Sequence, residues 1–126
     1  MNKNKNTPEF RFFYFTDKYE ETVNFYRNKL QLVELRSWDR GENDKGAIFH
    51  SPNGTGYIEI EEGREAPVLQ GSLYVEVEEV DRWYEFVLSK GIKIIQPLTD
   101  MSYGHRSFKF EDPNKLRIGL FRYNPS

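Results

Sequence analysis

The sequence predicts an α+β fold in which two βαβββ modules form a curled mixed sheet. The first observation is the order of the elements, because a strand, an amphipathic helix and three further strands occur twice along the 126 residues. The second is a weak echo at the residue level, in which Leu30 and Leu32 after the first helix correspond to Ile92 and Ile94 after the second. A period of roughly sixty residues with the same element order indicates a repeated supersecondary unit.

The first module is expected to span residues 10–61. It starts with an aromatic run of high strand propensity, residues 10–15, which ends at the turn-forming and cap-forming pair Thr16-Asp17. Apolar residues then follow at spacings of four, three and four, as on one face of an amphipathic helix. These residues are Tyr19, Val23, Tyr26 and Leu30. Three extended segments separated by turn formers complete the module, at residues 33–38, 47–50 and 57–61.

A linker at residues 62–70, which has no clear periodicity, precedes a second module at residues 71–123. This module again begins with an alternating strand, at residues 73–77, and its helix ends at the stop signal Lys90-Gly91. The expected apolar face of the helix consists of Val80, Trp83, Val87 and Leu88. The three strands that follow are expected at residues 92–95, 107–110 and 116–121.

Composition and charge favour a single cytoplasmic domain. With 20 acidic and 18 basic residues and no dense basic block, the chain lacks the charge pattern of a nucleic-acid-binding protein. The absence of cysteine excludes disulfides, thiolate zinc sites and cysteine nucleophiles, and it fits a reducing compartment. Residues 1–9 are polar and are expected to be frayed, with neither a signal peptide nor a membrane anchor. Residues 10–126 are expected to form one domain.

Three stretches of the chain carry a family resemblance. They are FRFFYFTDKYEETVNFYRNKL, GYIEIEE and YGHRSFKFEDPNKLRIGLF. Together they resemble the vicinal oxygen chelate superfamily, which contains the glyoxalases, bleomycin resistance proteins and extradiol dioxygenases. The resemblance implies two half-barrel modules that enclose a groove. Lys115 stands where the family's Asp-Pro turn normally has a glycine, and Asn114 is a residue that can adopt the left-handed backbone conformation.

The resemblance also implies where a metal would bind, because metal-dependent members place one ligand on the first strand and one on the last strand of each module. These positions correspond to Phe10, Glu59, Ser72 and Gly119. Only Glu59 keeps a carboxylate, whereas a catalytic divalent ion needs at least three N or O ligands. His50 and His105 flank turns and are expected to be exposed or satisfied at a sheet edge. We therefore expect no metal and no cofactor, as in the metal-free branch similar to bleomycin resistance proteins.

Alternation along the strands indicates which side chains share the groove face, because residues two apart point the same way. The candidate ligand-binding residues are Tyr14, Trp38, Tyr57, Glu59, Tyr74, Glu76 and Arg117. The aromatic side chains of Phe10, Phe12 and Phe121 are expected either to line the groove or to fill the core. Trp38 is a candidate for the groove rim, while Trp83 on the second helix is expected to pack under the sheet or at a subunit contact.

Glu59 is the strongest single candidate, since burying a carboxylate at an inward strand position costs free energy unless the charge has a partner. It is expected to meet Arg117 in an internal salt bridge, to meet water, or to meet a ligand. Aromatic rings beside such a carboxylate favour a flat or cationic small molecule. The leading hypothesis is thus a homodimeric binding protein that sequesters a drug or metabolite, as in antibiotic resistance. The alternative is a lyase, isomerase or dioxygenase-type enzyme with Glu59 as its base or metal ligand.

Overall fold

A computed structural model describes residues 8–125, and every structural statement below concerns these residues. It contains two four-stranded mixed sheets, with strand orders β1-β4-β3-β2 and β5-β8-β7-β6. Within each sheet the first and last strands of the module pair in parallel, and the remaining neighbours are antiparallel. The α+β prediction is therefore confirmed. No helix in the described part of the chain is long and apolar enough to cross a bilayer.

The first module follows the predicted order closely. Its strands are β1 (Arg11–Thr16), β2 (Glu34–Asp39), β3 (Lys45–His50) and β4 (Tyr57–Glu62). Between β1 and β2 the chain forms α1 (Tyr19–Asn24) and a π-helical turn, η1 (Phe25–Lys29). The widened turn is closed by a hydrogen bond of 2.8 Å from the backbone N–H of Leu30 to the carbonyl of Phe25. It lets the neighbouring rings of Phe25 and Tyr26 both lie buried, where a regular helix would turn one of them away.

The second module repeats this plan. It consists of β5 (Ser72–Glu76), α2 (Val80–Ser89), β6 (Ile94–Asp100), β7 (His105–Glu111) and β8 (Arg117–Tyr123). The edge strand β6 is longer than predicted and runs through Pro97, which an edge position tolerates because one side of the strand forms no ladder. Val80 and Val87 of the predicted helix face are buried, but Leu88 is exposed, so its assignment to that face was wrong.

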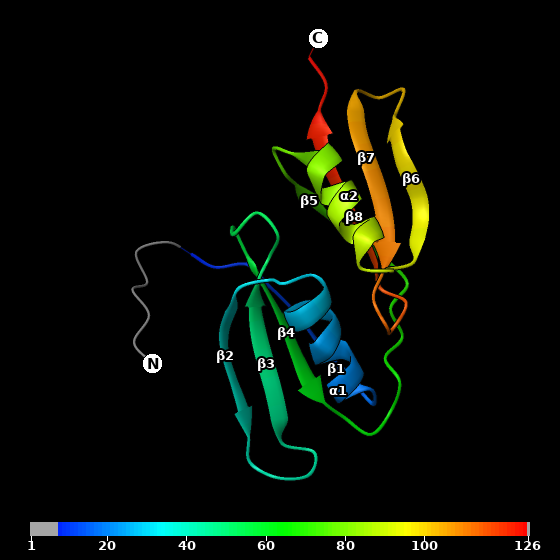
Figure 1. Ribbon diagram of the computed structural model, residues 1–126. Coiled ribbons are helices and arrows are strands. Elements are labelled where there is room, and N and C mark those ends of the chain that lie inside the picture. Colours follow the sequence, from blue (N-terminus) through cyan, green and yellow to red (C-terminus); the bar gives the residue numbers. More distant parts are fainter. Residues whose placement is uncertain (1–7, 126) are drawn as a thin grey trace.

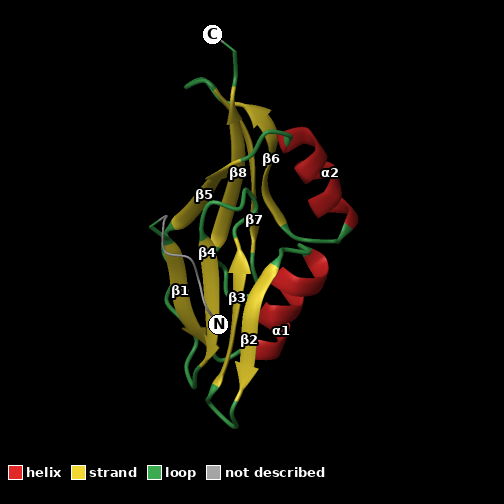
Figure 2. Ribbon diagram, turned by 90° about the vertical axis from the view of Figure 1, so that its left-hand side faces the viewer, coloured by secondary structure: helices red, strands yellow, loops and turns green. Residues whose placement is uncertain are grey.

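The sheets form one layer and the helices another. Figure 2 shows α1 and α2 on the same side of the strands, so that each sheet has one face covered by a helix and one face without a helix. The buried core lies between the sheets and the helices, and it includes the whole predicted apolar face of the first helix. We call the helix-free surface of the two sheets the open face.

A buried carboxylate joins the two modules. Asp112, in the β7–β8 turn of module two, accepts hydrogen bonds from the hydroxyls of Tyr14 on β1 and Tyr26 on η1, the latter at 2.8 Å. Its other oxygen accepts the backbone N–H groups of Asn114 and Leu116, at 2.8 and 2.9 Å. Burial and the negative charge of Asp112 raise the pKa of both tyrosines well above the usual range, so the two hydroxyls remain donors.

The adjacent side chain of Asn114 completes this joint. Its amide donates to the hydroxyl of Thr22 at 2.8 Å and accepts from the hydroxyl of Thr16 at 2.6 Å. Asn114 does not adopt the left-handed conformation. Lys115 does so instead, with φ +67°, because it occupies the position that closes the turn on the carbonyl of Asp112. In Figure 1 this turn descends from module two toward α1 and β1.

Replacing Asp112 should therefore loosen the joint between the modules. We expect Asp112→Ala to lower the free energy of unfolding by about 3 kcal/mol, because four hydrogen bonds to a charged group are lost and two buried hydroxyls are left without their acceptor. Urea denaturation measures this change. The matched control is Asp17→Ala at an exposed acid, which should stay within about 0.5 kcal/mol of wild type. Equal stability of the two variants would contradict the assignment of Asp112 as the joint.

Candidate functional site

Strand register decides which side chains occupy the open face. Phe13 of β1 pairs with Glu59 of β4, and Tyr74 of β5 pairs with Gly119 of β8. Directly paired residues point to the same side of a sheet, so these four positions share the open face. Among the predicted ligand-binding residues, the open face carries Trp38, Tyr57, Glu59, Tyr74, Glu76 and Arg117.

Tyr14 lies on the opposite face, so the prediction that it points into the groove was wrong. It pairs with Ile60, and its side chain is buried against Asp112 beneath the sheet. Phe12 lies on the same side and packs against the core. The physical reason is that the aromatic run of β1 has no polar alternation, so nothing in the run itself fixed which of its residues point to the core.

The open face of module one instead presents two rings that the sequence reasoning left out. Phe13 is 45% exposed and Phe15 is 53% exposed, and their ring centroids lie 5.0 Å apart. Tyr57 adds a third ring from β4, in contact with His50 at 5.0 Å between centroids. Phe13 and Phe15 form an apolar strip along β1, a surface on which a flat molecule can stack, and Tyr57 lies beyond the Arg11–Glu59 pair.

Arg117, water and a ligand were the expected alternatives for Glu59, and the structure excludes the first of them. Arg11 of β1, and not Arg117, pairs with its carboxylate, with Nη1 2.6 Å from Oε1. Arg11 also binds Glu9 through Nε at 2.7 Å. Glu59 is only 7% exposed although it lies on the open face, so this guanidinium offsets the charge of a nearly buried carboxylate. Hydrogen bonding to Glu59 is in turn the main reason that the pKa of Arg11 is raised.

Glu61 is the second carboxylate of this face and has a different environment. Loss of water around it is the main cause that raises its pKa to about 7, and the hydrogen bond and negative charge of Glu59 add to the effect. Within residues 8–125 no lysine or arginine forms an ion pair with Glu61. Arg40 lowers its pKa only weakly, from a distance. Glu61 thus exchanges a proton near neutral pH.

The indole ring of Trp38 lies beside Glu61 on the open face. It lies over Gly46, where a Cβ atom would come within 2.1 Å of the ring, so only glycine leaves room for it. The guanidinium groups of Arg36 and Arg40 lie 4.8 and 5.6 Å from the ring centroid. Because Gly46 pairs directly with Glu61, the indole covers the sheet next to that carboxyl. The predicted rim position of Trp38 therefore corresponds to a ring laid flat on the edge of module one.

Module two presents a similar surface of aromatic and charged side chains. Tyr74 is 49% exposed and covers Gly119, and the ammonium of Lys109 lies 5.2 Å from its ring centroid. The rings of Phe121 and His105 stack at 4.4 Å between centroids. Glu76 and Arg117 are exposed on the same face. Both halves of the open face therefore combine aromatic rings with acidic and basic groups, Glu59, Glu61 and Arg11 on module one and Glu76, Lys109 and Arg117 on module two.

Three of the predicted residues line one hollow at the junction of the modules. Tyr57, Tyr74 and Glu76 border a space of about 160 Å³ between the starts of β1, β4 and β5. Phe10, predicted for the groove or the core, lines the same hollow and is largely exposed. The volume lies below the roughly 300 Å³ typical of small-molecule pockets, so a single chain encloses only part of a ligand.

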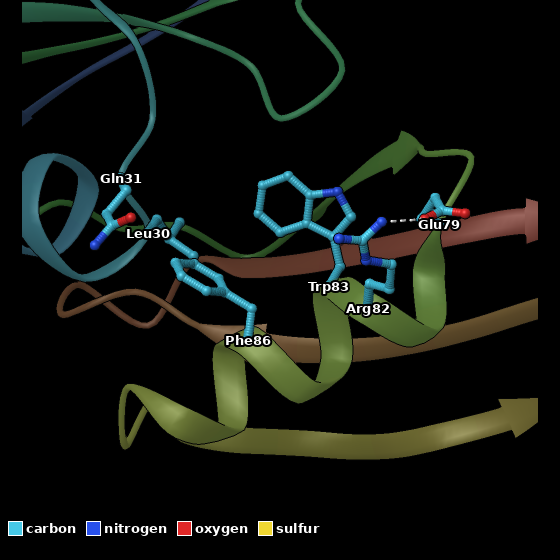
Figure 3. A pocket seen from close by; sticks show the side chains of 6 residues that line it. All are labelled: Leu30, Gln31, Glu79, Arg82, Trp83 and Phe86. Atoms are coloured by element: carbon cyan, nitrogen blue, oxygen red, sulfur yellow. Dashed lines mark hydrogen bonds and ion pairs between the residues drawn. The ribbon is translucent and has the colours of Figure 1, made fainter.

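A larger hollow lies on the helix side. It has a volume of about 410 Å³ and is lined by Leu30, Gln31, Glu79, Arg82, Trp83 and Phe86. Figure 3 shows Trp83 projecting from α2 into this space, opposite the loop that follows η1. The ring of Trp83 meets that of Phe86 edge-on, with centroids 6.0 Å apart. The two charged residues at its border, Glu79 and Arg82, pair with each other at 2.8 Å.

The residues at the implied metal positions do not suit a divalent cation. Phe10 precedes β1, and Arg11 is the β1 residue beside Glu59. Neither of these two residues, nor Ser72 or Gly119, carries a carboxylate or an imidazole. A guanidinium next to the single carboxylate repels a metal ion. The described residues also contain no cluster of three or more histidine, cysteine, aspartate or glutamate side chains with the spacing of a metal site.

Glu61 makes stability depend on pH. A carboxyl whose folded pKa of about 7 exceeds its unfolded value binds its proton more tightly in the folded state. Stability should therefore fall as pH rises through about 4.5 to 7, by about 1 kcal/mol since the carboxyl is partly exposed to water. Urea denaturation at a series of pH values tests this. Glu61→Gln should remove most of the decrease in the free energy of unfolding with pH, and Glu62→Gln should keep it. An unchanged decrease in Glu61→Gln would show that another group causes the pH dependence.

Comparison with known proteins agrees with this architecture. The sequence profile of the Glyoxalase/Bleomycin resistance protein/Dioxygenase superfamily matches residues 10–120. No curated protein resembles the chain closely enough to count as a match. Among solved structures, a glyoxalase/bleomycin resistance protein/dioxygenase from Nocardioides superposes with a TM-score of 0.72 at 19% identity, covering 98% of this chain and 88% of that chain.

Two further structures show the same fold. TioX from Micromonospora sp. ML1 gives a TM-score of 0.73 at 15% identity, covering 93% of this chain and 99% of that one. YycE from Bacillus subtilis, described as a putative glyoxalase/fosfomycin resistance protein of unknown function, gives 0.68 at 19% identity, covering 94% and 90%. The profile match spans most of the sequence and the repeated modules agree with it. The chain belongs to the glyoxalase/bleomycin resistance protein/dioxygenase superfamily.

Proposed function

We propose that this protein is a metal-independent small-molecule binding protein that sequesters an aromatic or cationic ligand on the open face. The observation that carries the proposal is the exposure of Phe13, Phe15 and Tyr74, each about half open to water on a face without a helix. Covering such rings removes apolar area from water at about 25 cal/mol per Å². Carboxylates lie among them, so a flat cation would gain stacking and charge complementarity together.

The interactions of Glu59 support binding rather than catalysis. A general base must be free to take a proton from a substrate, but the carboxylate of Glu59 is nearly buried and held by Arg11 at 2.6 Å. The donor set at the implied metal positions likewise supports a metal-independent function.

A homodimer is part of the proposal. The hollow at the β1–β5 junction is small, and the rings of the open face are flat and exposed within one chain. A second copy placed over this face would deepen it into a groove. We further propose a cytoplasmic protein without nucleic-acid or membrane partners. Drug sequestration is the role we favour, because one structural neighbour is described as a putative resistance protein.

Thermal-shift screening of cationic aromatic antibiotics and aromatic metabolites tests the proposal. A ligand present at 100 times its Kd should stabilise the folded state by about 2.7 kcal/mol. The double variant Phe13→Ala, Phe15→Ala should lose this shift, because the stacking strip is removed. Val68→Ala, at an exposed apolar residue of the linker, should retain it. A shift retained by the double variant would contradict the site, and one bound equivalent of zinc, nickel, iron or manganese per chain would contradict metal independence.

A further inference from the structure

The two carboxylates of the module-one open face differ in how their charge is compensated. Glu59 has a full cationic partner in Arg11, with Nη1 and Oε1 2.6 Å apart, and is nearly buried. Glu61, two residues further along β4, has no ion-pair partner within residues 8–125 and is less buried. A ligand cation that approached Glu59 would have to displace Arg11, while one that approached Glu61 would meet a carboxyl that shares a hydrogen bond with Glu59 and has no cationic partner among the described residues.

Aromatic side chains flank Glu61 on both sides. Phe15 of β1 is its direct partner on one side, and Gly46 of β3, covered by the Trp38 indole, is its partner on the other. A carboxylate between a phenyl ring and an indole is the arrangement that binds a planar cation, since the rings attract positive charge and remove competing water. We propose, resting on the proposed binding function, that Glu61 rather than Glu59 is the residue that pairs with the ligand's amidinium or ammonium group.

The charged groups around Glu61 make this pairing dependent on pH. Glu59 lies on the same strand as Glu61, and Asp44 and Arg40 lie in the β2–β3 connection. Phe15 on β1 is uncharged, and the guanidinium of Arg36 on β2 lies 4.8 Å from the centroid of the Trp38 ring. Glu59, Asp44 and the loss of water favour the protonated carboxyl, and Arg40 opposes them weakly. A bound cation favours the ionised form instead. Binding therefore releases the Glu61 proton to the buffer, up to one per ligand below neutral pH.

Benzamidine and its uncharged isostere benzamide are suitable probes, because they share a ring and a planar substituent and differ in charge. Isothermal titration calorimetry at pH 6.5, in two buffers of different ionisation enthalpy, measures both affinity and protons released. Wild type should bind benzamidine at least tenfold more tightly than benzamide and should release a proton only with benzamidine. Its affinity for benzamidine should rise about tenfold from pH 6 to pH 8, as a carboxyl with a pKa of about 7 ionises.

Variants assign these effects to one residue. Glu61→Gln should abolish the preference for benzamidine, the proton release and the rise with pH, while benzamide binding stays within about twofold of wild type. Glu62→Gln, which removes the same charge one residue away on the opposite face of β4, should keep all three effects. The proposal would be overturned if Glu59→Gln lost the preference for benzamidine over benzamide and Glu61→Gln kept it. Circular dichroism of each variant verifies folding, and the proton release of wild type requires no variant at all.

The outcomes also separate this inference from the proposed function. Equal affinity for the two probes without proton release would overturn the role of Glu61, while the stacking surface would stand. Failure of both probes to bind at millimolar concentration would overturn both. Proton release by wild type that is absent from Glu61→Gln supports the inference, and a purely structural role of Glu61 would not produce it.

Discussion

The buried carboxylate of Asp112 determines how the two modules sit relative to each other. Each βαβββ module can complete its own sheet and helix, so nothing in the backbone hydrogen bonding of either sheet ties one to the other. The tie comes from a turn of module two that places one charged group among the hydroxyls of Tyr14 and Tyr26. A buried charge is tolerated only when its donors are in place, so this contact is highly specific in geometry. The open faces keep a fixed relation because of it.

That fixed relation gives the open face its chemical character. The internal repeat places Glu59 of module one where Gly119 stands in module two, and Glu61 where Phe121 stands. The two halves are therefore alike in backbone but carry different residues at equivalent positions, and each combines acidic and basic groups on its open face. Arg11 compensates one of the carboxylates from within the chain, which leaves a surface suited to contact with a small molecule and unsuited to a metal ion.

The sequence was sufficient for the fold because periodicity and turn residues survive without tertiary context. The helix face from Tyr19 to Leu30 and the order of the eight strands follow from the spacing of apolar residues, which burial in the core then confirms. Facing was predictable only where polar and apolar residues alternate, as in β4 and β5. Five of the six residues from Phe10 to Phe15, at the start of β1, are aromatic. A shift of one residue therefore placed Tyr14 on the open face in the prediction and left out Phe13, which lies there in the structure.

The charge partners of the site were not predictable for a related reason. Arg117 lies on β8 in the second sheet, and only the register of β1 against β4 places Arg11 beside Glu59. The position of the Trp38 indole beside Glu61 likewise depends on a cross-strand contact, its packing over Gly46. The tryptophan and the glycine are each visible in the sequence, but their pairing across β2 and β3 is set by the hairpin.

The claim that ligands bind the open face has a direct test in chemical-shift mapping of the labelled protein. Two-dimensional NMR spectra recorded during titration with an aromatic ligand identify the amides that move. If the ligand binds the open face, the amide signals that move should belong to β1, β4 and the residues around Trp38, and those of α2 should stay unchanged. Shifts gathered around Trp83 and Phe86 instead would place the ligand in the hollow on the helix side and contradict the account.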